Sequence, residues 1–262
     1  MIIKEYARPS TLNEAYEILT SKEGANLIGG GAYIRLWDRE INTAIDLSNL
    51  NLTYIKDKDQ IIEIGAMTSL RQIEVSPTIK NNFNGILVEA VKPILGVQMR
   101  NIFTIGGSIC GKYGFSDVIT ALLSLDTYLE FYHRGKVSLE DFLKEDNSEK
   151  DILTKVLINK DGRKVSFKSL RNTSTDFAVL NVAVSRLDKE LKIAVGARPG
   201  IAKLALEAMK FAKEVELNEE NIQEIGKKVA EELKFTTNLR GSAEYREEVC
   251  KALVKRAVME VI

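Results

Sequence analysis

Two short runs of glycine constrain the fold of this chain more than any other feature of its 262 residues. Gly29–Gly31 directly follows an apolar run, and Gly106–Gly107 lies within Gly96–Asp117, a stretch that is rich in glycine and has no periodic pattern. A glycine has no Cβ atom, so a ligand phosphate can approach its backbone N–H group closely. Each run is compatible with a phosphate-binding loop or with an ordinary tight turn, and either run alone leaves both interpretations open.

Neither glycine run completes a nucleotide-binding motif. A dinucleotide-binding fingerprint would need a third glycine where Ile34 stands, so we interpret the acid downstream, Asp46, as a structural residue at the end of a strand. The segment Gly106–Lys112 nearly spells the phosphate loop of nucleotide hydrolases, but Tyr113 replaces the serine or threonine that would bind Mg²⁺. A nucleotide hydrolase is therefore disfavoured.

Composition excludes several classes of protein. The chain has 37 basic and 37 acidic residues, and this zero net charge argues against nucleic-acid binding. It has no apolar run long enough to span a membrane and no signal peptide, which predicts a soluble, cytoplasmic protein. Its two cysteines, Cys110 and Cys250, predict neither a disulfide framework nor a metal cluster. The single histidine, His133, is expected at the surface, and no catalytic or metal-binding set of residues is predicted.

The pattern of short strands and helices predicts an α+β architecture with domains at 1–55, 56–160 and 161–262. A capping box, Thr11–Glu14, opens the first helix, and Asp161-Gly162 predicts a hairpin turn between the strands on either side of it. We expect strands at 2–6, 26–28, 43–47, 61–64, 128–132, 152–158, 163–170, 178–186 and 191–196. We expect helices at 11–19, 69–75, 84–92, 138–142, 201–214, 219–234 and 243–259, while 118–125 is a buried helix or strand.

An ordered series of weak motifs covers nearly the whole chain. Besides the first glycine run and the strand 45–47, it consists of Ile64–Thr68, Arg100–Ser108, Ser116-Asp117, Arg171–Ala178 and Leu239–Arg246. The series resembles the FAD-binding subunit, or middle domain, of molybdenum hydroxylases, a family that includes xanthine dehydrogenase and carbon monoxide dehydrogenase. The resemblance implies a two-lobed FAD-binding fold of the p-cresol methylhydroxylase type, followed by a C-terminal domain of a sheet and helices.

The resemblance also implies which residues contact FAD. The two glycine segments would hold its pyrophosphate, and an acid would contact the adenosine side. The implied contacts are Leu27, Ile28, Gly29, Gly30, Gly31, Ala32, Tyr33, Ile34, Ile94, Thr104, Ile105, Gly106, Gly107, Ser108, Asp117, Leu153 and Lys168.

In the family, electrons pass from a molybdopterin-binding large subunit through a [2Fe-2S] small subunit to FAD, and then to NAD or another acceptor. The resemblance therefore implies an electron-transfer subunit. The alternative is an assembly subunit that has lost FAD, because Ser108 replaces the usual asparagine and Gly111–Phe115 departs from the family pattern. Within that stretch we expect Lys112 to be solvated and Cys110 to have no redox role, and we expect Tyr33 and Trp37 to pack in the core.

Overall fold

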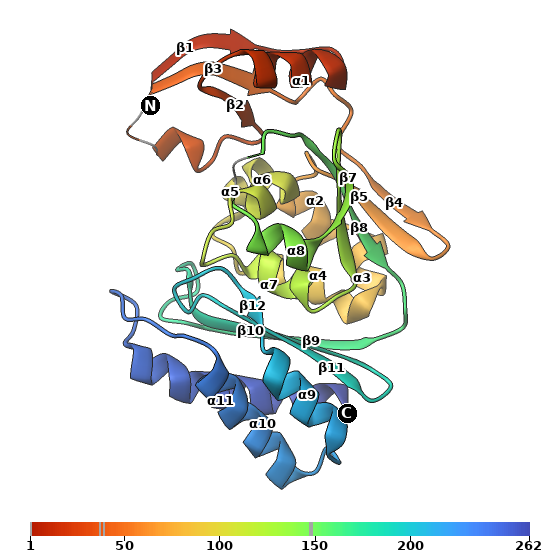
Figure 1. Ribbon diagram of the computed structural model, residues 1–262, viewed down its shortest axis with the longest axis vertical. Coiled ribbons are helices and arrows are strands. Elements are labelled where there is room, and N and C mark those ends of the chain that lie inside the picture. The colour runs from red at the N-terminus through yellow and green to blue at the C-terminus, as the bar shows by residue number, and fades with distance from the viewer. Residues whose placement is uncertain (1, 37, 39, 147–148) are drawn as a thin grey trace. The chain divides into compact units, whose positions relative to one another are not determined.

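The computed structural model describes residues 2–36, 38, 40–146 and 149–262, which form two compact units (Figure 1). Unit 1 comprises Met1–Ile73, Val97–Gly111 and Thr127–Ile158, and unit 2 comprises Glu74–Gly96, Lys112–Asp126 and Asn159–Ile262. The domains predicted from the sequence are contiguous, whereas both units are assembled from separated stretches. The mixture of helices and sheets confirms the predicted α+β class.

Unit 1 begins with a small parallel sheet in the order β1-β3-β2, formed by β1 (Ile2–Ala7), β2 (Ala25–Ile28) and β3 (Glu40–Asp46). Helix α1 (Leu12–Ser21) packs on it through Ala15 and Leu19. The Thr11 hydroxyl accepts a hydrogen bond from the Glu14 N–H at 3.1 Å, as the capping box predicts, while the Glu14 carboxylate accepts from the N–H of Ser10. This sheet delivers the end of β2 directly into the first glycine run.

The second sheet of unit 1 has five strands in the order β4-β5-β8-β6-β7. These strands are β4 (Ile55–Lys58), β5 (Ile61–Gly65), β6 (Thr127–Phe131), β7 (Gly135–Ser138) and β8 (Leu153–Asn159). The short helices of the surrounding chain are η1 (Ile34–Leu36), α2 (Leu70–Val75), α5 (Val97–Ile102), α6 (Ile105–Cys110) and α8 (Leu139–Lys144). The stretch expected to be irregular, 96–117, therefore contains two helices, α5 and α6. They were missed because six-residue helices are too short to display a periodic pattern.

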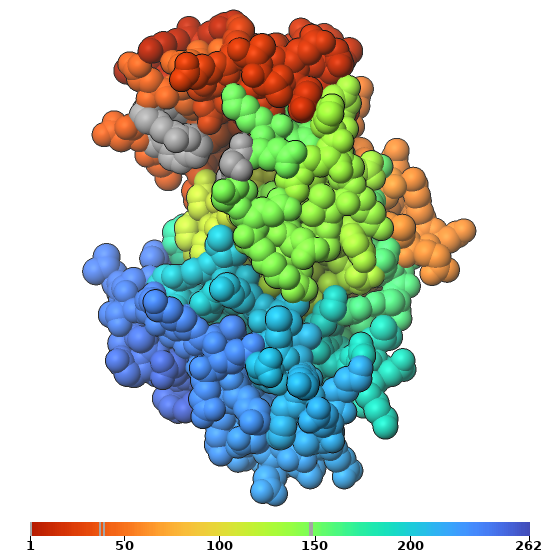
Figure 2. All heavy atoms as spheres, in the orientation of Figure 1, coloured from red at the N-terminus to blue at the C-terminus, as the bar shows by residue number. Residues whose placement is uncertain are grey.

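Unit 2 is built on an antiparallel sheet in the order β12-β11-β10-β9. Its strands are β9 (Lys164–Arg171), β10 (Ala178–Leu187), β11 (Glu190–Gly196) and β12 (Lys203–Leu204). Helices α9 (Leu206–Glu214), α10 (Glu219–Glu232) and α11 (Ala243–Val261) cover one face, and α4 (Ile86–Val91) and α7 (Asp117–Leu123) cover the other (Figure 1). In the space-filling view the atoms of α9–α11, drawn in blue, form one continuous surface of unit 2 (Figure 2).

Alternation along β10 assigns its side chains to the two faces of this sheet. Leu180, Val182 and Val184 enter the hydrophobic core shared with α9–α11. Asn181 points to the opposite face, where its side-chain oxygen accepts a hydrogen bond from the Thr120 hydroxyl of α7 at 2.8 Å. The face toward α7 is thus partly polar, although Asn181 is fully buried.

The predicted hairpin at Asp161-Gly162 is wrong. The strands on either side of this turn, β8 and β9, belong to different sheets. The Asp161 carboxylate accepts from the Arg163 guanidinium, and that guanidinium continues to the Ser124 carbonyl at 3.2 Å and the Ser185 hydroxyl at 3.0 Å. The chain does turn at Asp161-Gly162, but the buried side chain of Arg163 then holds the following strand within unit 2.

Two helix predictions were too long. The run 84–92 is interrupted because Phe83 and Asn84 have positive φ angles, so a short 3₁₀ turn, η2 (Phe83–Gly85), precedes α4. The run 201–214 begins with β12, which pairs with β11, before α9 starts. The remaining short helix of unit 2 is α3 (Pro77–Asn81). Among the described residues, no helix has the length and apolar character needed to cross a membrane.

The two cysteines differ sharply in accessibility. Cys250 is fully buried on α11, and burial raises the pKa of its thiol to about 12, whereas Cys110 is exposed. Because the thiolate is the reactive form, we expect only one thiol of the native chain to react rapidly with Ellman's reagent at about pH 8, and two after unfolding in guanidinium. The variant Cys110→Ser should retain no fast thiol. A fast second thiol in the native protein would contradict the burial of Cys250.

Candidate functional site

The first glycine run leaves β2 as a loop with open backbone donors. Gly31 has a φ of +70°, a left-handed conformation that favours glycine. No hydrogen bond within the described residues engages the backbone N–H groups of Gly30, Gly31 or Ala32, and Gly30 is exposed. Successive N–H groups of this kind form an anion-binding concavity.

The second glycine segment is the first turn of α6 rather than a loop. Thr104 caps this helix, since its hydroxyl accepts from the Gly107 N–H at 3.1 Å. The Ile105 and Gly106 N–H groups donate to carbonyls of Thr68 and Ala66, both at 2.9 Å. The Ser108 N–H and hydroxyl both donate to the Thr104 carbonyl, at 3.0 and 2.9 Å. The protein thus already uses the N–H groups that a phosphate loop would offer here.

The fold places the two glycine segments side by side, as their pairing predicts. An ideal Cβ atom on Gly29 would lie 2.7 Å from the Thr104 hydroxyl oxygen, and one on Gly30 only 1.5 Å from the Ile102 carbonyl oxygen. The rings of Tyr33 and Phe103 pack with centroids 5.0 Å apart. Residues separated by about seventy positions in the chain therefore lie together, and Tyr33, expected in the core, is half-buried and packs on Phe103.

The need for glycine at position 30 has a different cause from the one that a phosphate loop suggests. The nearest obstacle to a side chain is the backbone of the protein itself, at Ile102. At Gly107 the nearest atom is the Thr104 hydroxyl oxygen, 3.0 Å from an ideal Cβ. Gly30 is therefore required for the contact between the segments, whereas Gly107 tolerates a methyl group with a small shift of Thr104.

Asp117 is the acid that the resemblance places on the adenosine side of FAD. It is 4% exposed and opens α7 behind the Ser116 cap. Its two carboxylate oxygens accept from the Arg171 guanidinium at 2.6 Å and the Asn181 amide at 2.7 Å. Burial raises the pKa of the Asp117 carboxyl, and Arg171 and Asn181 offset part of that rise. Asp117 thus joins α7 to β9 and β10 within unit 2.

The two partners of Asp117 were not predicted from the sequence. Arg171 opens the motif Arg171–Ala178, which was singled out only as part of the resemblance. Asn181 is the one amide in the apolar run 178–184 of β10. A lone polar residue in a fully buried strand needs a hydrogen-bond partner, and this was the available signal.

The three remaining site residues lie in different surroundings. Leu153 is 4% exposed in the five-stranded sheet of unit 1. Ile94 follows α4 in unit 2, in a turn where its N–H donates to Val91. Lys168 faces α11, where it forms an ion pair with Glu260, whereas Asp117 lies on the opposite face of the same sheet. The structure does not cluster Lys168 with Asp117.

The structure also tests the predictions made for Lys112, His133 and Asp46. Lys112 is 8% exposed with a φ of +44°, so the prediction of a solvated side chain is wrong. His133 is exposed and stacks on Tyr16 with centroids 4.9 Å apart, in agreement with a surface role. The Asp46 carboxylate accepts from the Tyr6 hydroxyl and the Ser48 N–H, which is the structural role expected of it. Trp37 lies outside the described residues.

The structure removes the nucleotide-hydrolase interpretation. Six of the seven positions that would form the phosphate loop belong to α6 and its C-cap, Gly111. The next helix begins only at Asp117, so no helix follows Lys112 directly as that motif requires. Among the described residues no group of acids, cysteines and histidines is arranged to bind a metal ion.

The paired glycine segments suit a pyrophosphate. Neither Leu27–Ile34 nor Thr104–Ser108 contains an acidic residue that would repel it. The first segment supplies the N–H donors, and the second segment, with its N–H groups engaged within the protein, lies beside it and shapes the cradle. The glycines, the open donors and the absence of acids in these two segments all fit the diphosphate of a dinucleotide cofactor such as FAD.

Comparisons with known proteins identify the family. Residues 2–160 match the family described as the FAD binding domain in molybdopterin dehydrogenase, and residues 165–261 match the CO dehydrogenase flavoprotein C-terminal domain. The glyceraldehyde dehydrogenase medium chain of Sulfolobus acidocaldarius is 28% identical over 98% of this chain and 97% of its own length. The nicotine 6-hydroxylase medium subunit of Paenarthrobacter nicotinovorans is 26% identical over 97% and 96% of the two chains.

The fold agrees with solved structures of this type. A chain of carbon monoxide dehydrogenase from Hydrogenophaga pseudoflava superposes with a TM-score of 0.90 at 22% identity, covering 98% of this chain and 96% of that one. This likeness confirms the predicted flavoprotein fold with its C-terminal domain. The chain is a flavoprotein subunit of an oxidoreductase: it belongs to the family of FAD-binding subunits of molybdopterin dehydrogenases, and its cofactor is FAD.

Proposed function

We propose that this chain is the electron-transfer subunit of a multi-subunit molybdenum hydroxylase. It would receive electrons from [2Fe-2S] clusters on a small subunit, downstream of a molybdopterin-binding large subunit, and pass them to NAD or another acceptor. This assignment is supported by two relatives that match the chain over nearly their whole length, the medium chain of glyceraldehyde dehydrogenase and the medium subunit of nicotine 6-hydroxylase. The observation that carries the proposal is the pair of adjacent glycine segments, the first of which has open N–H donors.

Two groups of residues would hold the cofactor. The N–H groups of Gly30, Gly31 and Ala32 would donate to the pyrophosphate, and the rest of 27–34 and 104–108 would shape the cradle. Ile94, Asp117, Leu153 and Lys168 complete the proposed contact set.

Bound FAD supplies the redox chemistry, and the protein contributes position and electrostatics. The two cysteines lie on different units, one on α6 and one buried on α11, so they do not form a cluster site within the chain. The iron–sulfur clusters must then belong to a partner. The intact glycine segments favour retention of FAD over an assembly subunit that has lost it.

Electron transfer is tested with the purified complex. We expect co-expression with the neighbouring large and small subunits to yield a complex that contains molybdenum, iron and about one FAD per copy of this chain. After anaerobic reduction with dithionite, addition of NAD should restore the oxidised flavin absorbance if NAD is the acceptor, and a quinone should restore it if NAD fails. A chain that purifies alone, or a reduced flavin that neither acceptor reoxidises, would contradict the proposal.

Substitution of Gly107 tests the pyrophosphate contact apart from folding. The methyl group of the Gly107→Ala variant would meet only the Thr104 hydroxyl oxygen, at 3.0 Å, and alanine favours a helix by about 1 kcal/mol over glycine, so its melting temperature without FAD should change little. A methyl group against the pyrophosphate should nevertheless weaken FAD binding about tenfold or more, measured by the quenching of flavin fluorescence. Unchanged FAD affinity would place the pyrophosphate elsewhere.

A further inference from the structure

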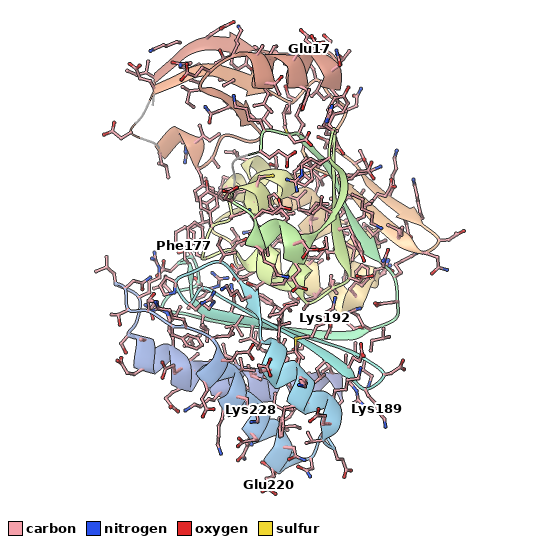
Figure 3. The ribbon with its side chains drawn as sticks, in the orientation of Figure 1. Glu17, Phe177, Lys189, Lys192, Glu220 and Lys228 are labelled. Atoms are coloured by element: carbon pink, nitrogen blue, oxygen red, sulfur yellow. The ribbon has the colours of Figure 1, made fainter. Side chains whose placement is uncertain are left out.

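Unit 2 contains a pocket of about 360 Å³ that none of the proposed FAD contacts lines. It lies where the Gly111–Phe115 segment meets the two C-terminal motifs, and its wall includes Phe115, Phe177, Pro199, Gly200, Asn238 and Arg240. Figure 3 labels Phe177, whose side chain marks the position of the pocket in unit 2. The volume falls within the roughly 300–1,000 Å³ of small-molecule sites.

One wall of the pocket is aromatic. The rings of Phe115 and Phe177 lie with centroids 4.2 Å apart and planes tilted by 38°, and Tyr113 stacks on Phe115 behind them. The Arg240 guanidinium lies 5.0 Å from the centroid of the Phe177 ring. This wall offers apolar ring surface to a flat ligand, since aromatic groups favour tilted or offset contacts.

A buried positive charge lies next to lining residues of the pocket. Arg198 lies between the lining residues Ala197 and Pro199 and is 7% exposed, and an ideal Cβ on Gly200 would lie 3.6 Å from its guanidinium. The partners of this guanidinium are carbonyl oxygens, those of Lys234 at 2.7 Å and Ile201 at 2.9 Å. Among the described residues it has no carboxylate partner.

The second buried arginine next to the pocket is Arg246. Arg246 is fully buried, and its guanidinium donates to the lining residue Asn238 at 2.6 Å and to backbone carbonyls, including that of Val179. Within the described residues no carboxylate neutralises Arg246 either. By contrast, Arg171 pairs with Asp117, and Arg240 pairs with Asp176. Two guanidinium charges next to the pocket therefore remain uncompensated, and an uncompensated buried charge is costly.

Two guanidinium nitrogens near the pocket also lack hydrogen-bond partners. In the part of the chain that the structure describes, the buried side-chain polar atoms without a partner are Nε of Arg198 and Nε of Arg171. Arg171 also donates to the Asp176 carbonyl, directly before the lining residue Phe177. Buried donors are rarely left unsatisfied, and Arg198 is the one of these two residues that lies between lining residues of the pocket.

We propose that this pocket binds a small molecule in which a flat ring carries one anionic group, with the ring against Phe115 and Phe177 and the anion held by the field of Arg198 and Arg246. A carboxylate and a phosphate satisfy the same chemistry. None of its lining residues belongs to the proposed FAD contact set, and the proposal does not depend on the electron-transfer role.

The binding test compares three probes on the FAD-loaded chain. Benzoate carries a ring and a charge, benzamide carries the ring alone, and inorganic phosphate carries charge alone. In isothermal titrations we expect benzoate to bind saturably and at least about tenfold more tightly than either of the others, with the flavin absorbance unchanged. Equal binding of benzamide or of inorganic phosphate overturns the proposal, and release of FAD by benzoate overturns it by assigning the pocket to the cofactor.

Variants then locate the binding site. Arg198→Met should abolish the preference for benzoate over benzamide, whereas Arg186→Gln, a matched loss of charge at the end of β10 in the same unit, should leave it intact. Because loss of a buried arginine can prevent folding, Phe177→Leu provides a second test. It should weaken benzoate binding several-fold without changing the weak binding of phosphate. Benzoate affinity that is unchanged in Phe177→Leu overturns the proposal.

Discussion

Replacement of Gly30 by alanine is expected to abolish stable FAD binding and to destabilise unit 1. The new methyl carbon would lie 1.5 Å from the Ile102 carbonyl oxygen, far inside van der Waals contact. The backbone fixes the position of this carbon, and the obstacle is a backbone carbonyl, so no rotamer change relieves the clash. The two glycine segments must therefore move apart. Overpacking of this kind costs about 1–3 kcal/mol or more. A cradle built from both segments should then lose FAD affinity by well over tenfold, which flavin absorbance of the purified protein measures.

The control for Gly30→Ala is Gly135→Ala. Gly135 is the first residue of β7 in the same unit, directly after the turn from β6, and an ideal Cβ there has no neighbour within 4 Å although φ is +72°. This variant should suffer the strain of a left-handed alanine, about 1 kcal/mol, and keep its FAD. If Gly30→Ala retains FAD as fully as Gly135→Ala does, the close approach at Ile102 does not shape the cofactor site.

Replacement of Asp117 by alanine should lower the stability of unit 2 by several kcal/mol. It leaves the Arg171 guanidinium, whose side chain is 9% exposed, without its anion, and it leaves the Asn181 amide without its acceptor. Breaking a buried ion pair by removing one partner costs about 3–5 kcal/mol. At roughly 2–4 °C per kcal/mol for a unit of this size, the melting temperature should fall by roughly 10 °C. The melt is recorded without FAD, because lost ligand binding would otherwise add to the shift.

The pair Asp176 and Arg240 provides the matched control. Its side chains are 27% and 34% exposed, so Asp176→Ala should cost no more than about 1 kcal/mol. The double variant Asp117→Ala with Arg171→Met removes both buried charges and should recover part of the stability lost in Asp117→Ala. Equal melting temperatures for Asp117→Ala and Asp176→Ala would show that Asp117 does not depend on its buried partner.

The sequence predicted those parts of the fold in which local pattern and tertiary structure agree. The apolar runs 152–158 and 178–186 became β8 and β10, and the C-terminal helix was expected at 243–259 and extends over 243–261. Prediction failed where contacts between residues far apart in the sequence determine the structure. The chain at Asp161 turns as expected, yet Arg163 reaches Ser124 and Ser185, so the strand that follows joins another sheet. No local pattern encodes such a partner.

The candidate site was also predicted only in part. The pairing of the two glycine segments followed from the order of the motifs, and their contact confirms it. The helical state of 105–110 did not follow, because two adjacent glycines disfavour a helix and only the Thr104 cap and the carbonyls of Ala66 and Thr68 stabilise it. The burial of Lys112 was missed for a related reason, since a lysine in a glycine-rich stretch carries no sequence signal of an enclosed position.

The interleaving of the two units limits how this chain can be divided. The backbone passes from one unit to the other after residues 73, 96, 111, 126 and 158, so neither unit is a continuous piece of sequence. A fragment that starts at residue 161 would keep the whole β9–β12 sheet and α9–α11 but would lack α4 and α7, leaving the face around Asn181 uncovered. During synthesis, the segments of unit 2 that emerge first must wait for β9–β11 before they can pack on that sheet. Exchange of modules between relatives, in nature or by design, would therefore have to transfer the chain as a whole.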